Sequence, residues 1–487
     1  MPKLLSKSKY LNGLQCSKLL WVALNEPERL PEIAAATQHI FDQGHLVGEL
    51  ARKLFPGGIA IPAEDFLGNI TATREALRQR RPIFEAGIRA NNLFARADIL
   101  KPSGDSAWDI IEVKSSTGVK DIHIQDAAFQ KHCYQQAGLE INRCYLMHIN
   151  NQYVRRGEVD PSQLFTTVDI TEDVMLVLGS VPERVAEMLA VTSATLCPEA
   201  TIGPQCRDPY ECALTECWEG LPEHNVFTLY YGGKKSQELY NRGVLGIADI
   251  PAGDKLNEKQ SIQRVCVINN EPHIDRGAIR QFLSSLQYPL YFLDFETINP
   301  AVPLFDGTRP YQNTPFQFSL HVQAIPGGET KHSWHLADGP QDPRPELLAR
   351  LQQATGDEGS IVVYNQSFEQ SVLQDLGTTF PAYRGWSQAV IARLVDLIIP
   401  FRSFHYYHPA QRGSASIKHV LPAVTGSGYE GLAIAQGNDA SRAYLTMTYG
   451  GTPEAEKAAV RDDLLKYCGR DTDAMVNIVG RLGELSR

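Results

Sequence analysis

The chain has 487 residues, of which 43% are hydrophobic and 21% charged, the balance of a globular protein with more than one core. It contains no apolar run of transmembrane length and no apolar block of a signal peptide near its start, so we expect a cytoplasmic protein with no membrane partner. A formal net charge of −10 excludes a globally positive field, and any nucleic acid would have to be bound in local grooves.

The first fifty residues are predicted to be helical. Cys16 falls in a stretch, residues 11–24, whose leucines have helical spacing. A second helix is expected over residues 40–54, and a third over residues 70–87 with an interruption at Pro82.

A β-hairpin carrying charged residues is predicted next. Residues 93–100 read as a strand that ends near Asp98, and residues 108–114 read as its partner after a polar turn at 102–106. Period-two geometry places Glu112 and Lys114 on one side of the second strand. Asp98 and Glu112 have the chemistry to hold a divalent metal, with Lys114 orienting water or phosphate. The alternative is an edge hairpin with ordinary exposed charges.

A helix over residues 126–138 follows the hairpin. Its Gln130 and Tyr134 are four apart and share one face. The order Asp98, Glu112-Val113-Lys114, Gln130…Tyr134 resembles that of RecB-type PD-(D/E)XK nucleases. The resemblance implies that these five polar residues form a nuclease site.

Many members of this family carry a metal-binding histidine in an upstream helix, within a G-x-x-V-H-E pattern. The matching stretch here begins at Gly44 and has Gly48 in the position of that histidine. The resemblance therefore leaves Glu49 as a candidate metal ligand, with His45 as the alternative.

Three cysteines, Cys206, Cys212 and Cys217, fall in a loop rich in proline and aspartate. Thiolates this close in a reducing compartment suggest metal binding, and zinc is possible although its usual C-x₂₋₄-C pairs are absent. The spacing resembles the cysteine triplet of iron–sulfur nucleases of the AddB and CRISPR-associated RecB-like groups. That resemblance implies a [4Fe–4S] cluster whose fourth ligand is Cys16, with Cys197 as the rival.

A second acidic motif lies in residues 289–297, where it follows the apolar run 290–293. Asp294 and Glu296 lie two apart, so both carboxylates face one side of the expected strand and Phe295 faces the other. Two buried like charges repel each other and lose water, and a Mg²⁺ or Mn²⁺ ion is the usual remedy. The alternative is a strand that runs out into solvent.

Further polar residues follow at element ends along the C-terminal half. Glu369 lies where a helix begins after a strand at 360–364, and Asp396 lies within a segment at 389–397. Tyr467 and Asp471 share one face of a helix at 454–478.

Together with the D-x-E strand, this set resembles the DEDD-type 3′→5′ exonucleases that carry a tyrosine. The resemblance implies that Asp294 bridges two cations about 3.5–4 Å apart. Glu296 and Asp471 would each serve one cation, and Tyr467 would position water. Glu369 stands where the family has an aspartate, and Asp396 is the alternative for that role.

We therefore expect an α/β protein with two nuclease domains. Residues 1–220 would form a restriction-endonuclease-like PD-(D/E)XK domain with the cluster, 221–284 a helical connector, and 285–487 an RNase H-like DEDD domain. The expected activity is Mg²⁺- or Mn²⁺-dependent phosphodiester hydrolysis, exonucleolytic on single-stranded DNA, in DNA repair or defence. An RNA-processing nuclease, or a nucleic-acid-binding scaffold with one inactive site, are the alternatives.

Overall fold

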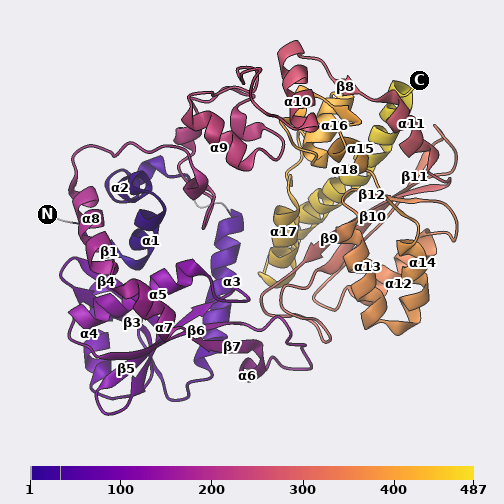
Figure 1. Cartoon of the computed structure of the whole chain (residues 1–487). Helices are drawn as coiled ribbons and strands as arrows, with labels where there is room; N and C mark the ends of the chain where they lie inside the picture. Colours follow the sequence, from indigo (N-terminus) through magenta and orange to yellow (C-terminus); the bar gives the residue numbers. More distant parts are fainter. Residues whose placement is uncertain (1–2, 33–34) are drawn as a thin grey trace. The chain divides into compact units, whose positions relative to one another are not determined.

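The computed structural model describes residues 3–32 and 35–487, and the chain divides into two compact units (Figure 1). Unit 1 consists of Met1–Gly220 with Pro300–Gln312, and unit 2 consists of Leu221–Asn299 with Asn313–Arg487. Both units combine helices with a β-sheet, which confirms the expected α/β class. The segment expected as a helical connector, residues 221–284, belongs to unit 2.

Unit 1 is built on a seven-stranded sheet in the order β2-β3-β4-β5-β6-β7, with β1 paired to β4. The strands β3, β4 and β5 are antiparallel neighbours, whereas β5 and β6 are parallel and are joined by the helix α5. The strands are β1 (Leu5–Ser6), β2 (Ile59–Ala60), β3 (Ile83–Ala90), β4 (Leu93–Ser103), β5 (Ala107–Lys114), β6 (Ile141–Ile149) and β7 (Phe165–Asp169).

Two separate apolar clusters pack against the strands of unit 1. One contains Phe129 of α5, and the other contains Val47 and Leu50 of α3. The helices are α1 (Lys7–Gln15), α2 (Ser17–Asn25), α3 (Ala35–Arg52), α4 (Phe66–Leu77), α5 (Asp121–Gln136), α6 (Pro161–Leu164), α7 (Thr171–Leu178) and α8 (Val181–Ser193).

Three expectations for unit 1 were wrong. The helix predicted over residues 70–87 is α4 followed by the strand β3, because the apolar residues after Pro82 have a period of two in a sheet. The stretch around Cys16 is not one helix: Cys16 is extended, with a φ of −162°, between α1 and α2. The strand β4 does not end near Asp98 but runs to Ser103.

Unit 2 is built on a five-stranded sheet in the order β11-β10-β9-β12-β13. The strands β11, β10 and β9 are antiparallel, and β12 and β13 continue the sheet in parallel with β9. The sheet strands are β9 (Leu290–Ile298), β10 (Thr314–Gln323), β11 (Thr330–Leu336), β12 (Ile361–Val363) and β13 (Leu394–Asp396).

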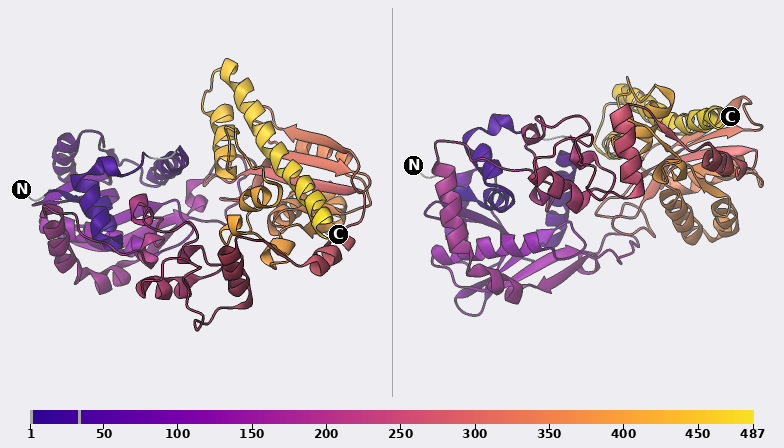
Figure 2. Two further views of the ribbon diagram at one scale, coloured as in Figure 1. Left: turned by 90° about the horizontal axis from the view of Figure 1, so that it is seen from above. Right: turned by 45° about the horizontal axis from the view of Figure 1, so that its top comes forward.

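The central strand β9 is buried on both faces, as its apolar run predicts. Phe292 joins a core that includes Met475 of α18, and Phe295 joins the core that includes Leu347 of α12 on the other face. In Figures 1 and 2, α18 is the long yellow helix that runs beside this sheet.

The helices of unit 2 are α9 (Gly233–Asn241), α10 (Glu258–Asn269), α11 (Arg276–Ser284), α12 (Arg344–Ala354), α13 (Ser367–Thr379), α14 (Arg384–Ile391), α15 (Ile399–Arg402), α16 (Ile417–Thr425), α17 (Gly437–Tyr449) and α18 (Glu454–Leu485). The expected connector contributes the strand β8 (His273–Ile274), which pairs with β14 (Tyr406–Tyr407) of the C-terminal half. Within residues 3–32 and 35–487, no helix has both the length and the apolarity needed to cross a bilayer.

Candidate active sites

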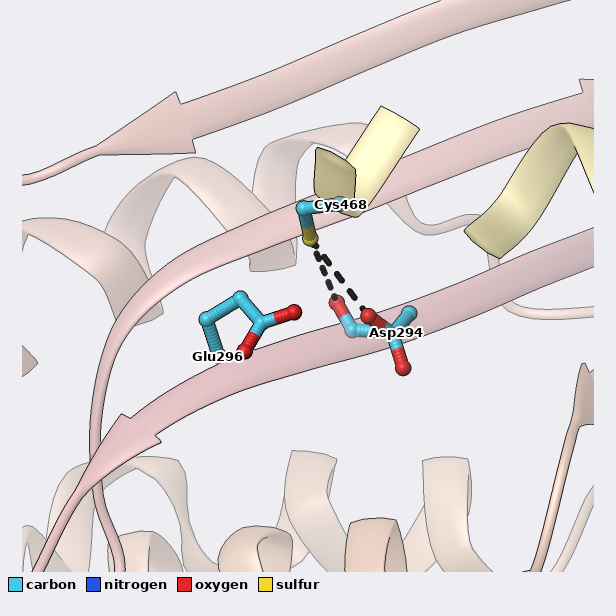
Figure 3. A group of neighbouring side chains, drawn as sticks. All are labelled: Asp294, Glu296 and Cys468. Atoms are coloured by element: carbon cyan, nitrogen blue, oxygen red, sulfur yellow. Dashed lines mark hydrogen bonds between the residues drawn. The ribbon is translucent and has the colours of Figure 1, made fainter. Parts of the chain in front are cut away.

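The acidic pair of β9 faces α18. Asp294 and Glu296 alternate with Phe295, so both carboxylates lie on the α18 side of the sheet. Cys468 of α18 reaches the same place, and its Sγ donates to Asp294 Oδ2 at 3.5 Å (Figure 3). One ligand atom from each of these three residues lies within 4.8 Å of the others. Cys468 was not among the residues predicted for this site, because contact with β9 is not readable from a helix pattern.

Two further acids complete what we call the acid cluster, which consists of Asp294, Glu296, Glu369 and Asp471. Glu369 lies in the first turn of α13 and is only 1% exposed, and its Oε2 has no hydrogen-bond partner. Asp471 comes from α18 and accepts a hydrogen bond from the Tyr429 hydroxyl. The charge of Asp471 raises the pKa of Asp294, and the charge of Asp294 raises the pKa of Glu296 and of Glu369. The four carboxyl groups are therefore close enough to act on one another.

The carboxyl groups of the acid cluster resist ionisation without a cation. Burial and the charge of Asp471 raise the pKa of Asp294 well above its usual value, and burial and Asp294 do the same for Glu296 and Glu369. Burial also raises the pKa of Asp471 to about 6, against the opposing effect of Tyr429 and Lys418. An unpartnered buried oxygen among four acids is the donor set that a hard divalent cation would satisfy.

Lys418 acts on three members of this cluster, since its charge lowers the pKa of Asp294, Glu296 and Asp471. Its Nζ lies 5.3 Å from the centre of the Tyr467 ring. Burial, followed by the charge of Asp471, raises the pKa of Tyr467 above its usual range. The Tyr467 hydroxyl therefore keeps its proton at neutral pH and is able to donate a hydrogen bond.

Asp396 has a different environment from the acid cluster. Its carboxylate accepts the backbone N–H groups of Asn365 at 2.9 Å, Gln366 at 3.1 Å and Ile398 at 3.1 Å. These three bonds tie the end of β12 to the end of β13. We therefore assign Asp396 to shaping the turn that precedes Glu369.

In unit 1, β4 and β5 bring Asp98 and Glu112 together. Their register pairs Ile99 with Ile111 and, continued by one residue, sets Asp98 opposite Glu112. Asp98 Oδ2 accepts the backbone N–H of Val113 at 2.7 Å. The alternation of side chains along β4 is interrupted at Asp98, since Ala97 and Ile99 are two residues apart yet belong to different cores.

Lysines surround the buried Glu112. Lys114 Nζ lies 2.6 Å and Lys7 Nζ 2.7 Å from the same oxygen, Oε1. Burial alone would raise the pKa of Glu112, but these two charges outweigh it and hold that pKa well below its usual value. Burial and the charge of Glu112 raise the pKa of Asp98 to about 7.

Two members of this site were not predicted. Lys7 is 105 positions from Glu112 in sequence, and nothing in its local pattern indicates the contact. Asp126, on α5, accepts from Lys114 at 2.9 Å and from Gln130 at 2.9 Å. It lies four residues before Gln130, and that spacing on one helix face was the available signal.

Gln130 and Tyr134 have different surroundings although they share a helix face. Gln130 Nε2 donates to Glu112 Oε2 at 2.7 Å, inside the site. The Tyr134 hydroxyl donates to the backbone carbonyl of Ala86 and accepts from the N–H of Ala97, which connects β3 with β4.

Glu49 is exposed on α3, as is His45. The buried residues Val47 and Leu50 of this helix pack with Ile111, which points away from the face that carries Glu112. In the part of the chain that the structure describes, no hydrogen bond or ion pair joins Glu49 to Asp98 or Glu112.

The cysteine loop docks onto the N-terminal helices. Gln15 Nε2 donates to the carbonyl oxygens of Gln205 at 2.9 Å and Tyr210 at 2.7 Å, and Lys18 pairs with Glu216 at 2.8 Å. The two distant ends of unit 1 are thus held together beside Cys16.

Four cysteines share this place. Burial raises the pKa of Cys212, and the charges of Cys206, Cys16 and Cys217 raise it further. Cys197 is near Lys18 and Arg29, at the edge of the same apolar cluster. All these cysteines are described, and no three of their sulfur atoms lie within 4.8 Å of one another.

This spacing bears on which metal group would fit. Zn–S bonds of about 2.3 Å would bring the sulfurs of a tetrahedral zinc site to about 3.8 Å from each other. The described cysteine sulfurs are therefore not drawn together as a tetrahedral zinc site would require.

Comparison with known proteins found similarity over part of the chain. Residues 291–416 match the family described as a domain of unknown function (DUF2779). Uncharacterized protein MG366 of Mycoplasma genitalium is 27% identical over 206 residues, covering 39% of this chain and 31% of that protein. Its homolog in Mycoplasma pneumoniae is 29% identical over 206 residues, covering 38% and 31%. The chain thus spans about a third of the length of these relatives.

Proposed function

We propose that this protein is a metal-dependent nuclease that hydrolyses phosphodiester bonds, with single-stranded DNA as the expected substrate. The observation that carries the proposal is the acid cluster, in which three buried carboxyl groups and the half-buried Asp294 meet, with the unpartnered Glu369 Oε2 among them. Burial disfavours the ionised form of every member of the acid cluster, and a bound cation would offset that cost in free energy.

The residues of unit 2 would divide the work as the DEDD resemblance implies. Mg²⁺ or Mn²⁺ ions held by the acid cluster would activate water and offset phosphate charge. Asp294 is linked electrostatically to both Glu296 and Asp471, and it would bridge the cations. Tyr467 would offer its hydroxyl to the attacking water, and Lys418 would offer a positive charge to the phosphate. The sheet, three antiparallel strands continued by two parallel ones, supports an RNase H-like domain.

Unit 1 would contribute a second site of the PD-(D/E)XK type. Asp98 and Glu112 would hold the metal, with Asp126 as an additional acid that the sequence pattern did not include. Lys114 bonds to both Glu112 and Asp126, so its ammonium group is held where water or phosphate would be oriented. Lys7 would have to yield its place on Glu112 Oε1 to a cation.

The cysteines of unit 1 would hold a [4Fe–4S] cluster through Cys16, Cys206, Cys212 and Cys217. The mutual influence of these four groups supports Cys16 over Cys197 as the fourth ligand. The cluster would have a structural role, because its ligands come from both the cysteine loop and the N-terminal helices. Gln15 and Lys18 also join these two segments.

The test is cleavage of single-stranded DNA labelled at its 5′ or 3′ end, in Mn²⁺, by the wild type, Glu112→Ala, Asp294→Ala and the double variant. We expect each single change to remove one cleavage activity by about a hundredfold or more and the double change to remove both. Asp357→Ala, which alters an exposed acid of unit 2, is the matched control and should cleave as the wild type does.

Full cleavage by the double variant would refute the proposal. The same assay on an RNA strand of equal sequence separates the two substrate classes. It is needed because metal ions held by carboxylates act on the phosphate, which DNA and RNA share. A wild type that binds either strand but cleaves neither, in Mg²⁺ or Mn²⁺, would instead identify a nucleic-acid-binding scaffold.

A further inference from the structure

A cavity of about 530 Å³ lies in unit 2, outside the acid cluster. Its lining includes Tyr230, Tyr231, Tyr364, Asn365 and Arg402, together with residues 413–417, and we call it the tyrosine pocket. The volume is within the range of sites that enclose a small organic group. None of the resemblances described above includes Tyr230 or Tyr231.

The tyrosine pocket lies where ligands are usually bound in a parallel sheet. Tyr364 and Asn365 follow directly after β12, and Arg402 lies at the end of the short helix after β13. Ligands of α/β proteins commonly bind outside the carboxyl ends of parallel strands. Asn365 is four residues before Glu369, so the pocket and the acid cluster are reached from the same end of β12.

Tyr231 combines an exposed aromatic ring with an uncommon backbone conformation. The residue is 82% exposed and has a φ of 47°, a backbone conformation that bulky side chains rarely adopt. Asn365, on the same lining, also has a positive φ of 77°. An exposed aromatic ring held at a backbone cost is a feature that points to ligand contact.

The neighbouring Tyr230 is rigidly supported. Its backbone N–H donates to the buried Gln263 at 2.7 Å, and its carbonyl accepts from the buried Gln260 at 3.0 Å. Its ring meets Tyr231 edge-on, with 4.6 Å between centroids, and packs against Phe404 at 4.8 Å. The wall of the pocket is therefore formed before any ligand arrives.

Arg402 gives the tyrosine pocket its charge. The residue is exposed, and in the described part of the chain no carboxylate pairs with its guanidinium group. Its nearest polar contact is Asn365 Oδ1, at 3.5 Å from Nη2. A guanidinium group beside aromatic rings matches a ligand with a flat base and a phosphate.

We infer that the tyrosine pocket binds one nucleotide of an unpaired nucleic-acid strand, with the base stacked on Tyr231 and the phosphate on Arg402. This inference rests on the proposed function and assigns to it a substrate-holding subsite. The first turn of α16, where Ser416 makes no side-chain cap bond, adds backbone N–H donors to the same lining. The segment that carries Tyr230 and Tyr231 would thus help to hold the nucleic-acid strand.

The experiment measures binding without cleavage. A fluorescein-labelled strand of twelve thymidines and an abasic strand of the same length are titrated with full-length protein in EDTA, and anisotropy is recorded. Tyr231→Ala should weaken binding of the thymidine strand by about 5- to 100-fold and leave the abasic strand unaffected. Tyr231→Phe keeps the ring and should bind as the wild type does.

Trp334→Ala removes another exposed aromatic ring of unit 2, 49% exposed on β11, and should change nothing. Arg402→Gln should weaken both strands and reduce the dependence of affinity on salt. Equal losses for the two strands in Tyr231→Ala, or no loss at all, would overturn base stacking, and an unchanged Arg402→Gln would overturn the phosphate contact.

The two proposals fail in different ways. If Tyr231→Ala binds normally while cleavage still depends on Asp294, only the tyrosine pocket is withdrawn. If Tyr231-dependent binding is found but Mn²⁺ supports no cleavage, the pocket remains and the nuclease assignment falls.

Discussion

Glu369 differs from the aspartate of the family pattern by one methylene, and it is the most buried member of the acid cluster. Its Oε2 has no partner within the protein, and burial and Asp294 raise its pKa. A metal ligand should lose its function when its charge is removed at constant volume. We therefore expect Glu369→Gln to lower Mn²⁺-dependent cleavage by the unit 2 site by about a hundredfold.

Glu329→Gln, at an exposed glutamate between β10 and β11, is the control and should retain cleavage. Comparison in a Glu112→Ala background isolates the unit 2 site. Undiminished cleavage by Glu369→Gln would show that this carboxylate does not hold metal.

Asp471 should make the stability of the metal-free protein depend on pH. Burial raises its pKa to about 6 in the folded state, above the value expected in the unfolded chain. The neutral carboxyl therefore stabilises the fold at pH values below the unfolded pKa, and this stabilisation is lost as the pH rises through about 6. In EDTA, we expect the melting temperature of the wild type to fall from pH 5 to pH 8 more than that of Asp471→Asn.

Added Mn²⁺ should reverse the loss at pH 8, because the cation favours the ionised form. Parallel pH curves for the wild type and Asp471→Asn in EDTA would contradict this account of Asp471. The comparison needs no cleavage and so stands apart from the nuclease assay.

At the scale of elements, α5 shows how one helix face serves two purposes. Gln130 reaches Glu112, whereas the Tyr134 hydroxyl connects the backbones of β3 and β4. Tyr134→Phe would leave two buried backbone groups without their partner, at a cost of about 1–3 kcal/mol. For a unit of this size we expect the melting temperature to fall by about 2–4 °C for each kcal/mol.

Cleavage below the melting temperature should persist in Tyr134→Phe, whereas Gln130→Ala should impair the unit 1 site at similar stability. The assay is run in an Asp294→Ala background, so that only unit 1 acts. Loss of cleavage without loss of stability in Tyr134→Phe would show that the hydroxyl takes part in the chemistry.

The extended residue between α1 and α2 is what allows Cys16 to face the cysteine loop, since a continuous helix would have directed its sulfur by helical spacing. We expect Cys16→Ser to lose the iron of an anaerobically purified protein and to destabilise unit 1. Cys197→Ser, and Cys266→Ser in unit 2 as a control, should keep their iron. A colourless protein loaded with zinc, prepared without oxygen, would contradict the cluster.

At the scale of the whole molecule, the sequence predicted what depends on short spacing. The alternation along β9 and the hairpin of β4 and β5 follow from period-two patterns, and the structure confirms them. The four acids of the acid cluster were found because motif order links distant segments. The sequence did not predict that the carboxylate of Asp396 accepts hydrogen bonds from backbone N–H groups.

Contacts between segments that have no pattern in common could not be predicted. Lys7 reaches Glu112 from the first helix, and Cys468 reaches Asp294 from the last. The segment Pro300–Gln312 lies between two strands of unit 2 yet clusters with unit 1, where Arg155 donates to the carbonyl of Leu304 at 2.6 Å. Neither composition nor periodicity distinguishes such residues from ordinary loop or helix residues.

The central claim is that separate groups of acids in this chain hold divalent cations, and locating those cations is its most direct test. Crystals of the full chain soaked in Mn²⁺ should give anomalous scattering peaks beside Asp294 and Glu296 and beside Asp98 and Glu112. Crystals of Asp294→Ala should keep only the second peak. Soaked wild-type crystals without a peak at either place would contradict the account.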